Sequence, residues 1–273
     1  MLFKETKFVV HPDYTRWESL WYDFRVIVQP LLLGFFPPYS IILTLSAAAG
    51  LGISVWLAED RKRFLVDIGL GILFISLLGA RLGYVVRNLS FFLNKPVQIP
   101  QFWLGGLSWA GGLLAATAAL WGVNLIWKEP LGELADIFLP LLGTTVVAIW
   151  LTAWGAGIGY GPPTDAWFGI PVRDLFGVHD YRWPLPIIGG LISGGWIIGT
   201  FLFPLKKSRE SGFRAGLGLL GIVFINGVIS LFRVNPAPTL WGLRWETWIS
   251  LVMVGLIIGF YFQGRKTTEK KQT

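Results

Sequence analysis

The 273-residue chain is 53% hydrophobic and only 14% charged, with a mean hydropathy of +0.59. Soluble domains carry about 25% charged residues, so this composition predicts an integral membrane protein. The net charge of +7 is dispersed over short loops, which argues against nucleic-acid binding, and the absence of cysteine excludes a disulfide framework, a thiolate nucleophile and a cysteine metal site.

The first 37 residues are rich in aromatic side chains, among them Trp17, Trp21, Tyr22 and Phe35. Aromatic side chains of this kind gather where membrane meets water. We therefore expect residues 1–37 to form an N-terminal interfacial arm. This stretch has no short apolar core followed by a cleavage site, so we expect no cleaved signal peptide.

Seven apolar stretches follow, and each is long enough to cross a hydrocarbon core of about 30 Å as a helix. They are 39–58, 64–86, 103–127, 133–160, 185–203, 213–232 and 247–262. The predicted fold class is an all-α membrane protein with one seven-helix transmembrane domain over 38–263. An ordered outer loop is expected at about 161–184, and a basic tail at 264–273.

The cations of the short loops predict the orientation, because cytoplasmic loops are enriched in lysine and arginine. One set of loops carries Arg61, Lys62, Arg63, Lys128, Lys206, Lys207, Arg209, Arg214, Arg265, Lys266, Lys270 and Lys271. The other set carries Arg87, Lys95, Arg173, Arg182, Arg233 and Arg244. The first set is predicted to be cytoplasmic, which puts the N-terminus outside and the C-terminus inside.

The stretch Gly79-Ala80-Arg81-Leu82-Gly83-Tyr84 places a full positive charge inside the second predicted span. An ionisable residue within a membrane span is by default a functional-site hypothesis. The guanidinium fork matches phosphate oxygens, so Arg81 is a candidate phosphate ligand. The simpler explanation is an arginine that snorkels to the interface, since Arg81 lies about 24 Å along the helix.

These residues and several later motifs resemble the bacterial prolipoprotein diacylglyceryl transferase family. Gly79 to Tyr84 matches a family motif, and Gly105-Gly106-Leu107-Ser108-Trp109-Ala110-Gly111-Gly112 is similar to the family's Gly-Gly-Leu-Ser-Phe-His-Gly-Gly. Further similarities are Ala135-Asp136 with Pro140, Tyr160 to Asp165, and Leu240 to Leu251. The resemblance implies a seven-span inner-membrane enzyme that moves diacylglyceryl from phosphatidylglycerol to a lipoprotein cysteine.

The chain departs from the family pattern at its polar positions. Ala110 stands where the family has histidine, and Trp150 falls where it has an essential arginine. Ala156, Ile158, Asn226 and Ser230 replace an asparagine, a glutamate, an arginine and a glutamate, whereas Arg233 fits the arginine that closes the sixth span. Asp136 lies in the first turn of the fourth predicted span, where the helix dipole explains it.

The catalytic residues are therefore unknown, and a lipid-binding set remains. Those candidates are Arg81, Gly111, Gly112, Tyr160, Thr164, Asp165 and Arg233. The small residues of the third span serve equally well for close helix packing. We expect no cofactor and no metal, because the pair His179-Asp180 has no further ligand at metal-site spacing.

Two functions remain open. The first is a divergent transferase whose partners are a phosphatidylglycerol-like phospholipid and a lipoprotein precursor. The second is a catalytically inactive relative that binds anionic phospholipid or acts as a membrane scaffold. A small-solute transporter is a more remote third, because the spans contain too few polar groups for a hydrophilic path.

Overall fold

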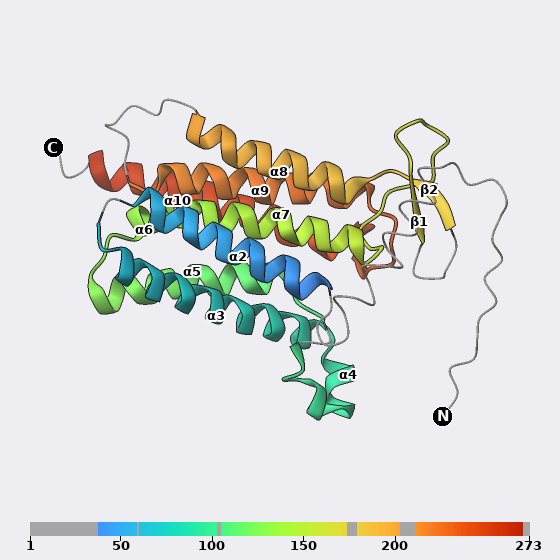
Figure 1. The fold of residues 1–273 in the computed structure, drawn as a ribbon, viewed down its shortest axis with the longest axis horizontal. Helices are drawn as coiled ribbons and strands as arrows, with labels where there is room; N and C mark the ends of the chain where they lie inside the picture. Colours follow the sequence, from blue (N-terminus) through green and yellow to red (C-terminus); the bar gives the residue numbers. More distant parts are fainter. Residues whose placement is uncertain (1–37, 59, 103–104, 174–178, 203–210, 270–273) are drawn as a thin grey trace.

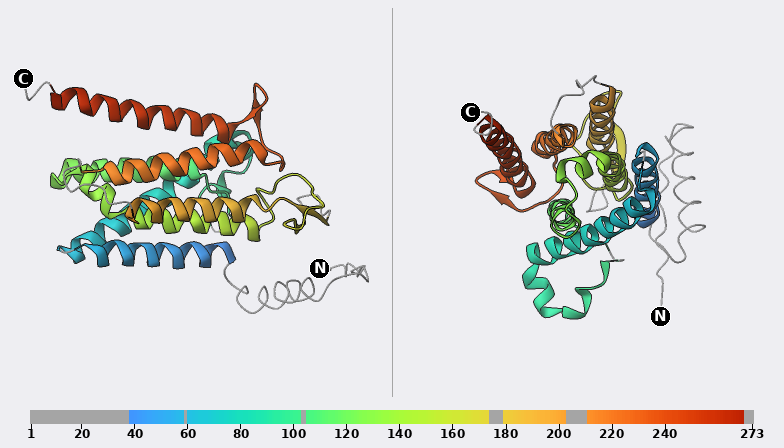
Figure 2. Two further views of the ribbon diagram at one scale, coloured as in Figure 1. Left: turned by 90° about the horizontal axis from the view of Figure 1, so that it is seen from above. Right: turned by 90° about the vertical axis from the view of Figure 1, so that its left-hand side faces the viewer.

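The computed structural model describes residues 38–58, 60–102, 105–173, 179–202 and 211–269 (Figure 1). The interfacial arm predicted for residues 1–37 and the last four residues of the basic tail lie outside this part of the chain. The described part is mostly helical, as the predicted fold class requires. Its long helices run side by side in one bundle (Figures 1 and 2).

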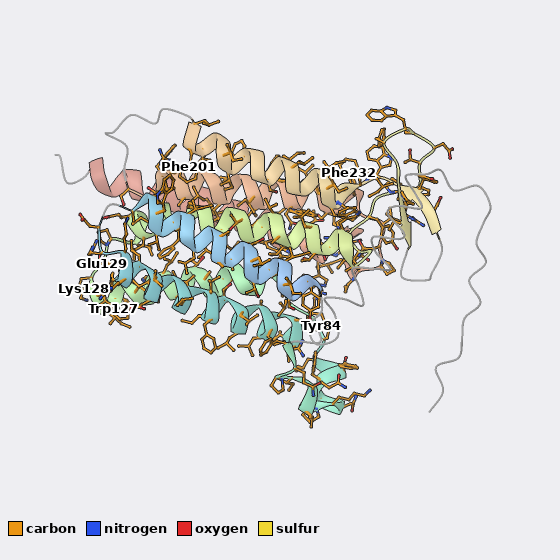
Figure 3. The ribbon with its side chains drawn as sticks, viewed as in Figure 1. Tyr84, Trp127, Lys128, Glu129, Phe201 and Phe232 are labelled. Atoms are coloured by element: carbon orange, nitrogen blue, oxygen red, sulfur yellow. The ribbon has the colours of Figure 1, made fainter. Side chains whose placement is uncertain are left out.

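The two ends of the bundle differ. One end carries two small hairpins, β1 (Ile170–Arg173) with β2 (His179–Arg182), and β3 (Thr239–Leu240) with β4 (Leu243–Arg244). We call it the hairpin end; Tyr84 and Phe232 lie toward it in Figure 3. Lys128 and Glu129 lie at the opposite end, here called the Lys128 end (Figure 3). The hairpin β1–β2 lies within residues 161–184, the segment predicted as an outer loop.

Five described helices are long and apolar enough to cross a membrane. They are α2 (Pro38–Leu57), α3 (Lys62–Arg87), α5 (Trp109–Trp127), α8 (Leu185–Leu202) and α9 (Phe213–Phe232). A sixth crossing is made if the bent pair α6 (Leu131–Ile137) and α7 (Leu139–Gly155) counts as one span. The helix α10 (Trp245–Glu269) has a shorter apolar stretch, Trp245–Ile257, so the seventh span stays a prediction.

The fourth predicted span is not a continuous helix. Its two parts, α6 and α7, meet at an angle of 50°. Pro140 stands in the first turn of α7, where it has no N–H to donate to the carbonyl of Asp136, and in an unbroken helix its ring would clash with that carbonyl. The second part ends at Gly155 rather than at Tyr160, and Gly157 and Gly159 follow with positive φ.

The third predicted span begins six residues later than expected. Gly105 and Gly106 have φ of 87° and 75°, a conformation that ends any helix, and α5 starts only at Trp109. The Ser108 hydroxyl caps the new start by accepting a hydrogen bond from the Gly111 N–H at 3.3 Å. This shift turns residues 105–108 into a loop at the hairpin end.

Apolar side chains cover the outside of the bundle as well as its core. On α3, Leu70, Phe74 and Leu78 recur every fourth residue and are exposed, as a lipid-facing stripe requires. Inside, the largest buried cluster joins α2, α3, α5 and α7 around Leu51, Ile68, Val123, Phe138 and Leu141. The helices are therefore held by packing within the bundle while their outer faces suit hydrocarbon.

Candidate lipid-binding site

The guanidinium of Arg81 is buried at the hairpin end and lies among backbone carbonyls. Its Nε donates to the Ile99 carbonyl at 2.8 Å and its Nη2 to the Gln98 carbonyl at 2.6 Å. Its Nη1 donates to the carbonyls of Gly105 and Gly106 at 2.7 and 3.1 Å. Four of the five guanidinium donors are thus used to hold the loop between α4 (Leu89–Asn94) and α5 against α3.

Aromatic rings complete the surroundings of Arg81. The guanidinium carbon lies 5.8 Å from the Tyr84 ring centre and 5.3 Å from that of Phe92. The side chain is buried and therefore does not snorkel to water. These contacts show that Arg81 holds the loop between α4 and α5 in place through backbone hydrogen bonds.

Gly111 and Gly112 lie at the contact between α5 and α3. A side chain at Gly111 would overlap the Gly79 carbonyl and come within 3.1 Å of the Gly83 Cα. The Gly112 carbonyl accepts a hydrogen bond from Ser76 at 3.0 Å. The sequence left two roles open for these glycines, lipid binding and close helix packing. In this structure both glycines permit close helix packing.

Tyr160, Thr164 and Asp165 lie in the segment that links α7 to β1. Tyr160 is buried, and the guanidinium carbon of Arg182 lies 4.8 Å from its ring centre. Thr164 donates its N–H to the Tyr181 carbonyl at 2.8 Å, which ties this segment to β2.

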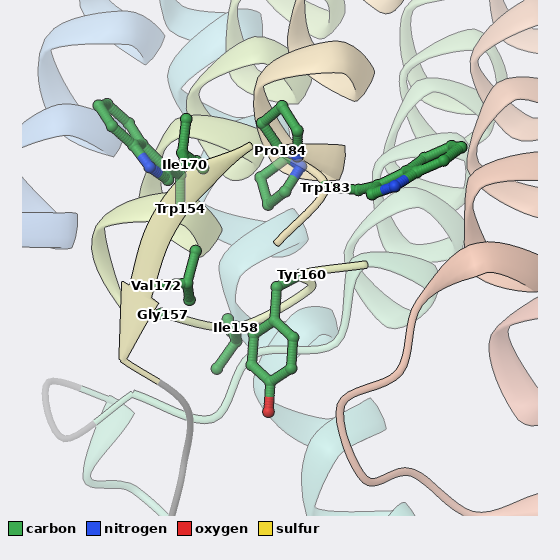
Figure 4. A pocket seen from close by; sticks show the side chains of 9 residues that line it. Trp154, Gly157, Ile158, Tyr160, Ile170, Val172, Trp183 and Pro184 are labelled. Atoms are coloured by element: carbon green, nitrogen blue, oxygen red, sulfur yellow. The ribbon is translucent and has the colours of Figure 1, made fainter. Parts of the chain in front are cut away.

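Tyr160 also borders a small cavity with Trp154, Ile158, Val172 and Trp183 (Figure 4). Its volume of about 10 Å³ suits a single water molecule, far less than a lipid head group needs. In Figure 4 the Tyr160 hydroxyl points away from Trp183 and Pro184.

A larger, polar cavity lies where α9 ends and the hairpin β3–β4 begins. Its volume is about 350 Å³, and its polar lining is supplied by Ser230, Arg233, Asn235, Thr239, Arg244 and Thr247. Arg244 is firmly placed, because its Nε donates to Glu246 at 3.0 Å and its Nη1 to the carbonyls of Asn235 and Arg233 at 2.6 and 3.2 Å. One cation of the cavity is therefore fixed by the chain itself.

Arg233 is the less well-paired cation of this cavity. Its side chain is 13% exposed, its Nε is buried without a hydrogen-bond partner among the described residues, and its Nη1 lies 4.0 Å from Glu246. Burial lowers the pKa of Arg233, the Glu246 carboxylate opposes this, and the charges of Arg244 and Arg87 add to the lowering. Two guanidiniums face one carboxylate here, so the cavity has an unmatched positive charge that an anion would neutralise.

The positions that the resemblance matches to polar residues of the family carry apolar, hydroxyl or amide groups in this chain. Ala110 and Trp150 are buried, and the Trp150 indole packs so tightly on α8 that a Cβ at Gly189 would lie 2.7 Å from its Cε2. Leu185 and Ile229 pack against the same indole. The space that an arginine side chain would need at position 150 is filled with hydrocarbon.

Asn226 and Ser230 join α9 to α10. The Ser230 and Thr247 hydroxyls form a buried hydrogen bond of 2.6 Å, and the Asn226 amide reaches the Ser250 hydroxyl at 3.4 Å. In the bundle these side chains are interhelical polar contacts of the kind that hold membrane helices together.

Of the residues that surround this cavity, only Arg233 is predicted from the sequence as a site residue, and Arg244 enters there only as a loop cation that sets the topology. Asn235, Glu246 and Thr247 are not predicted as site residues. The available signal was a cation followed two residues later by a carboxylate, at the start of the last predicted span. The structure shows that the two side chains are paired.

Asp136 has a different role from the predicted one. It lies at the end of α6, and its carboxylate accepts hydrogen bonds from the Gly212 and Ala215 N–H groups at 2.9 and 2.7 Å. It therefore caps the start of α9, a helix that begins 77 residues later in the chain. His179 lies in β2 opposite Arg173. Over the described ranges no group of three or more potential metal ligands occurs.

Comparison with known proteins agrees with the sequence resemblance. The family model of prolipoprotein diacylglyceryl transferases matches residues 35–263. A phosphatidylglycerol–prolipoprotein diacylglyceryl transferase of Geobacter sulfurreducens is 32% identical over 196 residues, 70% of each chain. The enzyme of that name from Solidesulfovibrio magneticus is 25% identical over 263 residues, 95% of this chain and 93% of the relative. This chain belongs to the prolipoprotein diacylglyceryl transferase family.

Proposed function

We propose that this protein transfers a diacylglyceryl group from a phosphatidylglycerol-like lipid to the cysteine of a lipoprotein precursor. Family membership supports the reaction class, and the relatives' names supply both substrates. The same family and the apolar helices place the chain in the bacterial inner membrane as a multi-pass protein.

The observation that carries the proposal is the cavity with Arg233 and Arg244. In the proposed reaction the precursor sulfur bonds to the glycerol carbon, the bond from that carbon to the phosphate oxygen breaks, and glycerol phosphate leaves with the bonding electrons. Arginines stabilise such a leaving phosphate because their donors match its oxygens. Arg233, whose Nε has no hydrogen-bond partner among the described residues, is the proposed direct ligand.

The other predicted lipid-binding residues act indirectly in this proposal. Arg81, Gly111 and Gly112 fix α3, α5 and their connecting loop, and Tyr160 and Thr164 fix the outer loop. Asp165 stays a prediction without a described contact that supports it.

We further propose the full topology of seven spans, with the N-terminus outside and the C-terminus inside. The hairpin end then faces outward, where exported precursors arrive. The cations at the Lys128 end support this orientation, because Arg61 pairs there with Glu129 and α3 begins there with Lys62 and Arg63. The arm over 1–37 and the basic tail over 264–273 keep their predicted places at the outer interface and in the cytoplasm.

A second candidate is a relative that binds the anionic lipid without turning it over. The comparisons do not favour it, but one observation does: Ala110 and Trp150 bring a methyl group and an indole to the positions where the family has histidine and arginine. General acid–base groups usually contribute about 10²–10⁴-fold to a rate, so this chain needs another acceptor for the thiol proton.

Complementation of a strain depleted of its own transferase tests the proposal. Growth with the wild-type chain, lost with Arg233→Gln and Arg244→Gln but kept with the matched control Arg63→Gln, is the expected result. Failure of the wild type at normal expression would rule out transfer. If the wild type fails, mass spectrometry of the lipid that co-purifies in mild detergent tests the second candidate: a lipid-binding relative still retains phosphatidylglycerol, and finding none would exclude it as well.

A further inference from the structure

A short segment projects sideways from the hairpin end of the bundle. It runs over residues 87–99 and contains α4 and the 3₁₀ helix η1 (Pro96–Gln98); we call it the platform. Figures 1 and 2 show α4 beside the end of α3 rather than stacked on the bundle. α3 has 26 residues, or about 39 Å, so its end and the attached platform lie at the level of the head groups.

The platform is fastened on one side only. Phe92 is buried, its ring centre is 6.1 Å from that of Tyr84, and Arg81 donates to the carbonyls of Gln98 and Ile99. The other apolar side chains are uncovered: Leu93 is 72% exposed and Val97 is 76% exposed, with Leu89 and Phe91 also exposed. An apolar surface of this kind, next to the lipid-facing stripe of α3, is suited to an acyl boundary.

All charged side chains of the platform are positive. Arg87 and Lys95 are exposed on the platform, and the sequence has no aspartate or glutamate between Asp67 and Glu129. Both cations lie over aromatic rings, Arg87 at 5.7 Å from the Tyr84 centre and Lys95 at 5.4 Å from that of Phe91. Exposed apolar groups combined with unopposed cations favour a layer of anionic lipid over a neutral one.

We propose that the platform is an interfacial binding surface for anionic phospholipid, with Leu93 and Val97 inserted among the acyl chains and Arg87 and Lys95 bound to the phosphates above them. The platform and the polar cavity lie at the same, hairpin end of the bundle, so the surface concentrates anionic lipid near the cavity. This binding does not depend on turnover, so it holds for either function considered above.

The cysteine-free chain allows a direct test of insertion. Leu93→Cys carries a bimane label in the full-length protein, reconstituted in vesicles of equal parts phosphatidylglycerol and phosphatidylcholine. Quenching by brominated acyl chains, with little quenching by aqueous iodide, is the expected result. A label open to iodide, or one shielded from both quenchers by protein, overturns the proposal.

The second part of the proposal, phosphate binding by Arg87 and Lys95, is tested by lipid selectivity. The ratio of phosphatidylglycerol to phosphatidylcholine that co-purifies from these vesicles is expected to fall about fivefold or more in the double variant Arg87→Gln/Lys95→Gln. The matched double variant Lys62→Gln/Arg63→Gln removes the same charges from the opposite end of α3, and its ratio should stay at the wild-type value. Equal ratios in the two double variants would overturn the assignment of the cations, whatever the outcome of complementation.

Discussion

Arg81 shows how one buried charge is accommodated in an apolar bundle. A charged residue in a span is costly unless it is paired, and here the partners are the carbonyls of Gln98, Ile99, Gly105 and Gly106. The sequence identified the unusual residue but not these partners, because every residue has a carbonyl and none carries a sequence signature. Only the positive φ of Gly105 and Gly106 brings their carbonyls to one guanidinium.

The contact geometry requires arginine rather than any cation. Arg81→Lys keeps the charge but replaces five donors in a fork by a single ammonium group, which cannot reach four carbonyls on two sides. We expect a loss of about 2–3 kcal/mol of stability, measured as a lower unfolding temperature in detergent, because buried carbonyls are left unpaired. The exposed Arg87→Lys serves as control and should change little; equal stability of Arg81→Lys and wild type would contradict the fastening role.

Trp150 fills the interior between α7, α8 and α9 with a large indole ring. Its indole lies against Gly189, where no side chain fits. Gly189→Ala is therefore expected to lower the unfolding temperature through overpacking, at a cost of about 1–3 kcal/mol. The double variant with Trp150→Leu should recover part of this loss, since the smaller side chain leaves room for the added methyl group. Additive losses in this double-mutant cycle would mean that the two residues do not interact.

At the scale of elements, the sequence predicted helices best where hydropathy alone decides. The structure begins and ends α2, α3, α8 and α9 within two residues of the predicted spans. The third and fourth spans differ because local backbone chemistry overrides hydropathy. Two glycines delay the start of α5, and Pro140 divides α6 from α7.

The bend between α6 and α7 brings Asp136 to another helix. Its carboxylate caps α9 through the Gly212 and Ala215 N–H groups, a contact between residues 76 and 79 positions apart. Asp136→Asn removes the charge that favours a helix start, so we expect a loss of about 1 kcal/mol in stability. Asp67→Asn, an exposed carboxylate on α3, is the control. Amide exchange at residues 212–216 should rise only in the first variant, and unchanged exchange would rule out the cap.

At the scale of the whole molecule, the two ends of the bundle differ in their charged groups. Arg81, Arg87, Arg233 and Arg244 lie at the hairpin end, whereas the ion pair Arg61–Glu129 lies at the Lys128 end. The sequence predicted Arg233 from the family pattern. It did not predict the cavity, because that needs α9, the hairpin β3–β4 and α10 to meet.

The side of the membrane that this cavity faces depends on the number of crossings, which the bundle leaves at five or six in its described part. Seven spans put the two termini on opposite sides, whereas six put them on the same side. Because the chain has no cysteine, Leu2→Cys and Gln272→Cys each provide a single label site. We expect an impermeant maleimide to modify Leu2→Cys in intact spheroplasts and Gln272→Cys only after permeabilisation.

Trp241→Cys, on the exposed turn between β3 and β4, should react like Leu2→Cys and so place the Arg233–Arg244 cavity on the outer face. If both termini reacted from the same side, α10 would not cross. Labelling of Trp241→Cys only after permeabilisation would put the cavity on the cytoplasmic face, out of reach of exported precursors.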